Sequence, residues 1–196
     1  DPWQLFFMWS LLMLPWALVG RLAAMWILWI ALFNFAIVLY HQSSGGALRF
    51  LLFADRETYW FVFLFNTLAL ALWEVLSRRW QWLAERWATR LLALAAGVPI
   101  TVLMLIVVFD YESIGAAPAI AWTVWLGGGF FVYRKLKPDL FMLAGGCLSG
   151  IVVFVSLLGR NMLDSPAGYL VIALIIIGLG AGAAVWLRNV HRELHA

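Results

Sequence analysis

Long uninterrupted runs of apolar residues alternate along the chain with short polar gaps. Seven runs can be read, each close to the roughly 20 residues that a helix needs to cross a bilayer: Pro2–Val19, Leu22–His41, Glu57–Ser77, Ala88–Phe109, Gly115–Tyr133, Asp139–Leu158 and Pro166–Leu187. Lipid offers the backbone no hydrogen-bond partners, so a spanning segment must be a helix or a strand of a closed barrel. Barrel strands would alternate apolar and polar residues, and runs such as Val171–Ile177 do not. The pattern predicts an all-α membrane bundle of about seven transmembrane helices.

The composition agrees with this interpretation. Of the 196 residues, 65% are hydrophobic and 12% are charged, whereas a soluble domain is about half apolar and about a quarter charged. Disordered proteins, disulfide-rich secreted domains and ordinary soluble enzymes are thereby excluded. The net charge is +3, but the basic residues lie in the short gaps between apolar runs. Membrane topology explains that placement better than binding to nucleic acid, which we do not expect.

The basic residues also predict an orientation. The loops of a membrane protein that lie in the cytoplasm carry its excess of Lys and Arg. Gaps one, three and five and the C-terminal tail hold ten basic residues, while gaps two, four and six hold three. The ten are Arg21, Arg78, Arg79, Arg86, Arg90, Arg134, Lys135, Lys137, Arg188 and Arg192, and the three are Arg49, Arg56 and Arg160. We therefore expect the N-terminus outside and the C-terminus in the cytoplasm.

The start of the sequence bears on the domain organisation. Asp1 opens the chain, and the apolar run that follows has no basic segment before it, so it is not a signal peptide. An outside N-terminus then needs an earlier span or a cleaved leader to place it there. We expect residues 1–196 to be a single transmembrane helical domain within a longer protein.

The third gap, Arg78–Arg90, is expected to form an amphipathic helix on the cytoplasmic membrane surface. Apolar residues recur there at helical spacing, and arginines form a stripe beside them. The apolar stripe is Trp80, Leu83, Trp87 and Leu91, and the basic stripe is Arg79, Arg86 and Arg90. The candidate lipid-interface residues are therefore Arg79, Trp80, Arg86, Trp87 and Arg90. They fit a membrane anchor, and they also fit a site for anionic lipid or a protein partner.

Ionisable groups near helix centres would indicate a catalytic or transport site, because they are costly in a membrane. No such group lies near a centre. Glu74 comes nearest, four residues before Arg78, and both an interfacial ion pair and a proton relay are open for it. Cys147 is the one cysteine, and the two lysines lie in a gap, where neither can hold a retinal Schiff base. We predict no cofactor, metal or catalytic residue.

Two Gly-x-x-x-Gly motifs suggest close packing of the last two helices. Gly146 and Gly150 lie on the sixth run, and Gly178 and Gly182 lie on the seventh. Small residues at this spacing let helix backbones approach closely in a membrane. We expect these two helices to pack directly against each other.

Six polar residues lie at a similar depth when they are counted inward from the outer end of each run. At 1.5 Å per residue their depths differ by about 3 Å. They are Ser10, Asn34, Asn66, Thr101, Thr123 and Ser149. They could form an interhelical hydrogen-bonded layer, or each Ser and Thr could bond its own helix backbone. We predict in particular that Asn34 pairs with Asn66, as a packing device or as the polar floor of a small outward-facing cavity.

Three segments resemble a known family. They are Asp1–Phe6 with Trp9 and Leu14–Trp16, then Pro138–Ala144 with Ser149 and Ile151, and last Val185–Arg188. The family they resemble consists of predicted polytopic bacterial inner-membrane proteins of unknown function (domain of unknown function 2157). The resemblance implies that this chain is the C-terminal portion of such a protein in the bacterial inner membrane, or a mature protein whose start is not shown. It implies no activity and no site residues.

Three functions remain open. The first is a non-enzymatic scaffold, assembly or envelope-maintenance component, with membrane lipids and either another membrane protein or a second copy of the chain as partners. The second is a small-solute or lipid transporter, with Pro15 and Pro99 as candidate helix breaks. The third is a membrane-surface lipid-modifying enzyme. It would use an outer group of polar residues: His41, Asp55, Glu57, Asp110, Glu112 and Asp164.

Overall fold

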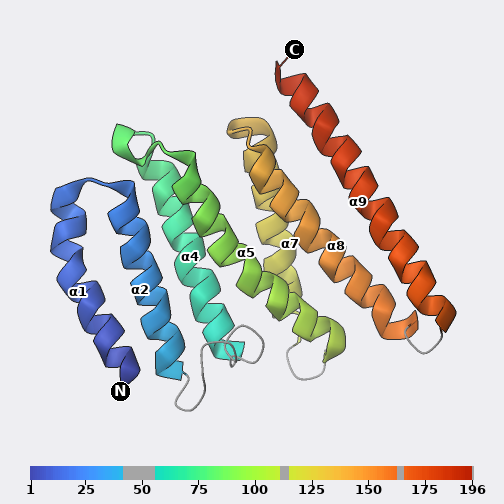
Figure 1. Cartoon of the computed structure of the whole chain (residues 1–196), viewed down its shortest axis with the longest axis horizontal. Coiled ribbons are helices and arrows are strands. Elements are labelled where there is room, and N and C mark those ends of the chain that lie inside the picture. The colour runs from blue at the N-terminus through green and yellow to red at the C-terminus, as the bar shows by residue number, and fades with distance from the viewer. Residues whose placement is uncertain (42–55, 111–114, 163–165, 196) are drawn as a thin grey trace. The chain divides into compact units, whose positions relative to one another are not determined.

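The structure, a computed structural model, describes residues 1–41, 56–110, 115–162 and 166–195. These residues form an all-α protein, as the sequence predicts, with seven α-helices, one short 3-10 helix (η1) and one π-helical turn (η2) (Figure 1). In chain order the elements are α1 Pro2–Gly20, α2 Ala23–His41, α4 Arg56–Leu76, η1 Gln81–Leu83, α5 Arg86–Phe109, α7 Ala117–Phe131, η2 Val132–Leu136, α8 Leu140–Met162 and α9 Pro166–His195.

Six of the helices (α1, α2, α4, α5, α8 and α9) are long and apolar enough to cross a membrane. The chain is therefore a multi-pass membrane protein. The expected fifth span is divided, because α7 has 15 residues and continues directly into η2. The helix ends otherwise agree with the predicted runs to within a few residues, apart from α9, which extends to His195. The orientation in the membrane stays a prediction.

The chain consists of two compact units, Asp1–Pro99 (unit 1) and Ile100–Ala196 (unit 2). The boundary falls inside α5, which is one continuous helix through Pro99. Pro15 likewise lies inside continuous α1. The two prolines that were candidate helix breaks therefore interrupt neither helix.

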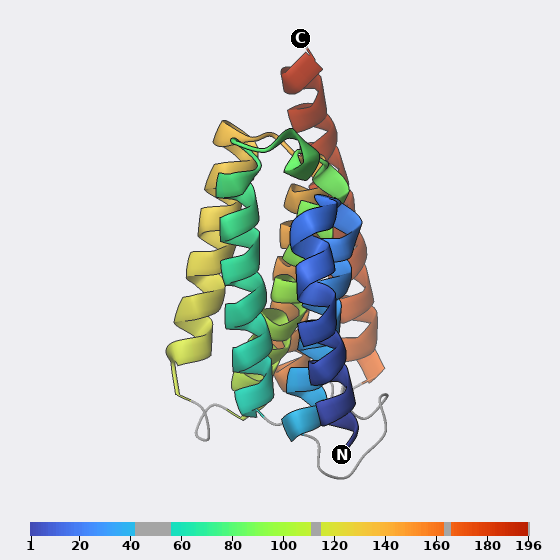
Figure 2. The ribbon, with the colours of Figure 1, turned by 90° about the vertical axis from the view of Figure 1, so that its left-hand side faces the viewer.

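In unit 1, α1 and α2 form an antiparallel hairpin whose turn is very tight (Figures 1 and 2). Arg21 ends α1 in the left-handed backbone region, with φ 46° and ψ 34°. A Cβ added at Gly20 would come within 2.9 Å of the Met25 sulfur, so the Met25 side chain would have to shift to admit a larger residue there. Aromatic rings join the two helices further along, with the centroids of Trp3 and Tyr40 5.1 Å apart.

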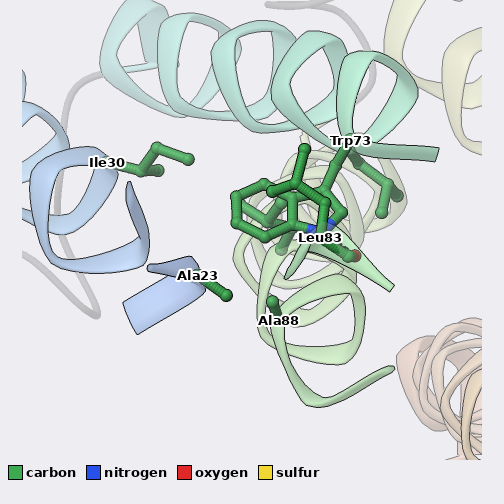
Figure 3. Packing of buried hydrophobic residues seen from close by; sticks show 7 residues of the cluster. Ala23, Ile30, Trp73, Leu83 and Ala88 are labelled. Carbon is green, nitrogen blue, oxygen red and sulfur yellow. Dashed lines mark hydrogen bonds between the residues drawn. The ribbon is translucent and has the colours of Figure 1, made fainter. Parts of the chain in front are cut away.

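The core of unit 1 forms where α2, α4 and the start of α5 meet (Figure 3). Its buried residues come from all three helices and from η1: Ala23, Ile30, Leu70, Trp73, Leu83, Ala88 and Leu92. The indole nitrogen of Trp73 donates a hydrogen bond to the backbone carbonyl of Leu83 at 3.1 Å. This bond ties the connection between α4 and α5 to the core.

The prediction of one amphipathic helix over Arg78–Arg90 is wrong. After α4 the chain makes a turn at residues 77–79, then forms η1, and α5 begins at Arg86. Leu83 is 3% exposed and packs inward against Trp73, whereas Trp80 is 48% exposed. A single surface helix would hold Leu83 and Trp80 on the same stripe. The burial of Leu83 in the core is incompatible with that stripe, so the segment bends.

In unit 2, the start of η2 and the two final helices, α8 and α9, pack around a small core. Tyr133, Leu143 and Val190 are its buried members, and Trp186 packs against them. Asp139 begins α8 by accepting a hydrogen bond from the backbone N–H of Phe141 through Oδ1 at 3.0 Å. An acceptor at this position satisfies a backbone donor that the helix itself leaves without a partner.

The helices α8 and α9 are packed side by side, as predicted, but not through their glycines. A Cβ added at Gly150, Gly178 or Gly182 would meet no other atom within 4 Å. At Gly146 it would meet Leu126 of α7 at 3.5 Å, which is ordinary contact. Bulky residues at one end of the pair, around Tyr133 and Val190, form its core. The Gly-x-x-x-Gly motifs therefore do not form this interface.

Candidate functional site: polar contacts between the helices

The two asparagines predicted to pair do so in unit 1. Asn34 Nδ2 donates to Asn66 Oδ1 at 3.1 Å, and Asn66 Nδ2 donates to Asn34 Oδ1 at 2.7 Å. The two side chains thus join α2 and α4 by reciprocal hydrogen bonds. Asn66 is completely buried and Asn34 is partly buried.

The remaining N–H group of each amide is also used. Asn34 Nδ2 donates to the backbone carbonyl of Ile30 at 2.9 Å, and Asn66 Nδ2 donates to that of Val62 at 2.8 Å. An amide nitrogen has two donors, so all four donors of the pair bond within unit 1. This arrangement fits the packing device, because it leaves neither amide a donor for a ligand.

Aromatic rings lie beside the pair, because each asparagine follows a phenylalanine. The rings of Phe33 and Phe65 approach to 4.8 Å between centroids, and Trp29 stacks on Phe33 at 5.8 Å. Such apolar neighbours lower the local dielectric, which strengthens the hydrogen bonds and makes the loss of one partner costly.

A second polar contact joins three helices of unit 2. The hydroxyl oxygens of Thr101 on α5 and Ser149 on α8 are 2.6 Å apart, and Trp122 Nε1 on α7 donates to Ser149 Oγ at 3.0 Å. Ser149 is therefore the centre of the cluster. The sequence placed Thr101 and Ser149 at one depth, but it gave no signal for Trp122.

The other two members of the expected layer bond to their own helices. Ser10 Oγ donates to the Phe7 carbonyl at 2.7 Å, and Thr123 Oγ1 donates to the Ala119 carbonyl at 2.8 Å. This is the alternative that serine and threonine have in a helix. Among the six residues, the structure therefore shows an asparagine pair in unit 1 and a Ser149-centred cluster in unit 2.

Two further contacts near helix ends were not foreseen. In unit 2, Arg134 Nη2 lies 3.3 Å from Glu193 Oε2, and its guanidinium carbon lies 5.5 Å from the centre of the Trp186 ring. Arg160 Nη1 donates to the Val108 carbonyl near the end of α5 at 2.7 Å. These partners are 59 and 52 residues apart, so no local pattern in the sequence could reveal them.

The candidate lipid-interface residues lie around the connection of α4 and α5. Trp80 is exposed and stacks on Trp82, with ring centroids 5.8 Å apart. Trp87 is in the first turn of α5, and its indole N–H donates to the Glu85 carboxylate. Arg79 and Arg86 are exposed and Arg90 is partly exposed.

The outer polar group proposed for an enzyme lies only partly within the described residues. His41 stacks on Phe61 at 5.5 Å between centroids, while Asp55, Glu112 and Asp164 lie outside those residues. In the parts of the chain that the structure describes, no three His, Cys, Asp or Glu side chains are grouped so that they could hold a metal ion.

The fold and these contacts define a multi-pass α-helical membrane protein in which the asparagine pair and the Ser149-centred cluster join helices. Comparison with protein-family models, with curated proteins and with solved structures finds no match to this chain.

Proposed function

We propose that the chain is a non-enzymatic structural component of the bacterial inner membrane, serving as a scaffold, assembly or envelope-maintenance protein. The observation that carries this proposal is the asparagine pair, in which every amide donor is bonded within unit 1. A transporter of polar solutes would need intramembrane donors for its substrate. Here these donors hold two helices together instead.

Exposed helix faces support a role in assembly. The central glycines of α9 have open space where a side chain would be, and many large apolar residues of the helix are exposed. Lipid covers such a surface in a membrane, and a helix of another membrane protein can replace that lipid. A structural component is expected to have a fixed partner, either another membrane protein or a second copy of this chain.

The test is purification of the tagged chain from native membranes in a mild detergent, with quantitative mass spectrometry of bound protein and lipid. We expect a small set of membrane proteins, or the chain itself, at constant stoichiometry in detergents of different chemistry. An unrelated tagged multi-pass protein of similar length is the control. A purified chain that carries nothing beyond what this control carries would overturn the proposal.

A second candidate function, transport of a small solute or lipid, is supported by the Ser149-centred cluster. Thr101, Trp122 and Ser149 bring polar groups of three helices together within apolar segments. A transported ligand that hydrogen-bonds there should raise the melting temperature of the purified protein. Ser149→Ala should abolish that shift, whereas Thr123→Ala, which removes a hydroxyl bonded to its own helix, should preserve it.

A further inference from the structure

The connection between α4 and α5 concentrates positive charge at one end of unit 1. We call residues 77–86 the basic turn. Arg78 and Arg79 are adjacent in it, Arg86 closes it, and all three are exposed. Residues 74–90 include four arginines and two acidic residues, Glu74 and Glu85, so the segment carries a net charge of +2.

The basic turn is held in place by its own backbone and by the core. The N–H groups of Arg78, Arg79 and Trp80 donate to carbonyls of the last turn of α4 at 3.3, 2.9 and 3.0 Å. At its other end the Leu83 carbonyl accepts the Trp73 indole N–H, and the Leu83 side chain is buried (Figure 3). The arginines therefore project from a fixed backbone, which reduces the entropy lost when they bind a ligand.

Exposed apolar side chains lie close in sequence to this charge. Val75, in the last turn of α4, is 63% exposed, and Leu91, in the second turn of α5, is 45% exposed. Trp80 follows Arg79 and Trp87 follows Arg86 in the sequence, and both tryptophans are exposed. Tryptophan at the ends of membrane spans typically lies at the level of the lipid headgroups.

From this combination we infer that the basic turn is a binding site for anionic phospholipid. The arginines bind the headgroup phosphate, for which guanidinium is well suited, and the acyl chains lie against Val75 and Leu91. Charge complementarity selects this occupant, because a zwitterionic lipid has the same phosphate and chains but no net negative charge. An acidic protein segment would meet the arginines but would have no use for the apolar surface beside them.

The inference does not rest on the proposed structural role. A chain without any protein partner could still bind anionic lipid here, and a scaffold could bind none. A negative result in the partner purification would therefore leave the lipid inference standing, and a negative result in the lipid measurement below would leave the structural role standing.

The experiment measures binding of phosphatidylglycerol to the purified full chain in detergent by native mass spectrometry. The variant Arg78→Gln/Arg79→Gln removes two charges from the basic turn. The matched control, Arg188→Gln/Arg192→Gln, removes two exposed charges from the end of α9. A basic residue near an anionic membrane contributes about 1 kcal/mol, which is about fivefold in affinity. We expect the first variant to weaken binding at least tenfold and the control to weaken it less than threefold.

Two further measurements separate the alternatives. Phosphatidylcholine should bind at least tenfold more weakly than phosphatidylglycerol, and inorganic phosphate at the same concentration should not displace the bound lipid. The variant Arg78→Lys/Arg79→Lys keeps the charge and should retain most of the affinity, which distinguishes lost binding from misfolding. The inference would be overturned if the basic-turn variant and the α9 control weakened phosphatidylglycerol binding equally. It would also be overturned if the two lipids bound equally well.

Discussion

Asn34 and Asn66 exchange hydrogen bonds across α2 and α4, each amide donating to the other and to a carbonyl of its own helix. Membrane-protein measurements give about 0.6 kcal/mol for such an interhelical contact, and at most near 2 kcal/mol. We expect Asn34→Leu and Asn66→Leu each to lower the free energy of unfolding by about 1–2 kcal/mol, because each leaves the partner amide without its interhelical bonds.

The double variant is the informative one. Replacing both asparagines by leucine removes the unsatisfied group together with its partner, so it should cost less than the two single changes added together. Unfolding in mixed micelles of increasing denaturing detergent gives the three free energies. Additive losses would mean that the two amides do not stabilise each other.

Ser149 is predicted to contribute more to the free energy of unfolding than Thr101 or Trp122. Ser149→Ala removes the bonds to Thr101 and Trp122 at once and leaves the Trp122 indole N–H without that acceptor, at a cost of about 1–3 kcal/mol. Thr101→Val removes only the contact between the two hydroxyls and should lower the free energy of unfolding by less. Thr123→Val is the matched control, since its hydroxyl bonds within α7. A control as destabilised as Ser149→Ala would argue against the cluster.

Arg21 is expected to be a site where glycine stabilises the protein. An L-residue in the left-handed region destabilises the backbone by roughly 1–2 kcal/mol. Glycine has no Cβ and adopts this conformation without that strain. Arg21→Gly should therefore unfold at a higher detergent fraction than Arg21→Ala, although both lose the same charge. If the alanine variant is equally stable, the turn does not hold residue 21 at positive φ.

The orientation can be tested at the two ends of the segment formed by α7 and η2. Single cysteines at Ala116 and Leu136, both exposed, are introduced into a Cys147→Ala background. The positive-inside rule places residue 116 outside and residue 136 in the cytoplasm. A membrane-impermeant thiol reagent added to intact cells should label Ala116→Cys and leave Leu136→Cys unlabelled until the membrane is permeabilised. Labelling of both from outside would contradict the predicted topology.

The helices and the asparagine pair could be predicted from the sequence for a simple reason. In a membrane the backbone must be helical wherever the side chains are apolar, so the length of each run sets the helix. A lone asparagine on each of two consecutive spans has few partners other than its counterpart. Depth along the helices was then sufficient to match Asn34 with Asn66.

The failures arise where packing outweighs local pattern. Helical spacing from Trp80 to Leu91 predicts one surface helix, but burying Leu83 against Trp73 requires the chain to turn. The glycines of α9 permit close packing without requiring it, and larger side chains around Tyr133 form the contact with α8 instead. Partners such as Arg160 and Val108 are remote in sequence, so only the folded structure brings them together.

The boundary between the two units has a consequence for biosynthesis, because it falls at Pro99 and Ile100, inside a helix of 24 residues. Divided there, α5 would leave two pieces that are each well short of the roughly 20 residues needed to cross a bilayer. A ribosome that completes unit 1 is thus already part-way through the hydrophobic segment that opens unit 2, and the insertion machinery receives both halves as one. Splitting the gene at this boundary would therefore divide one spanning helix between two products.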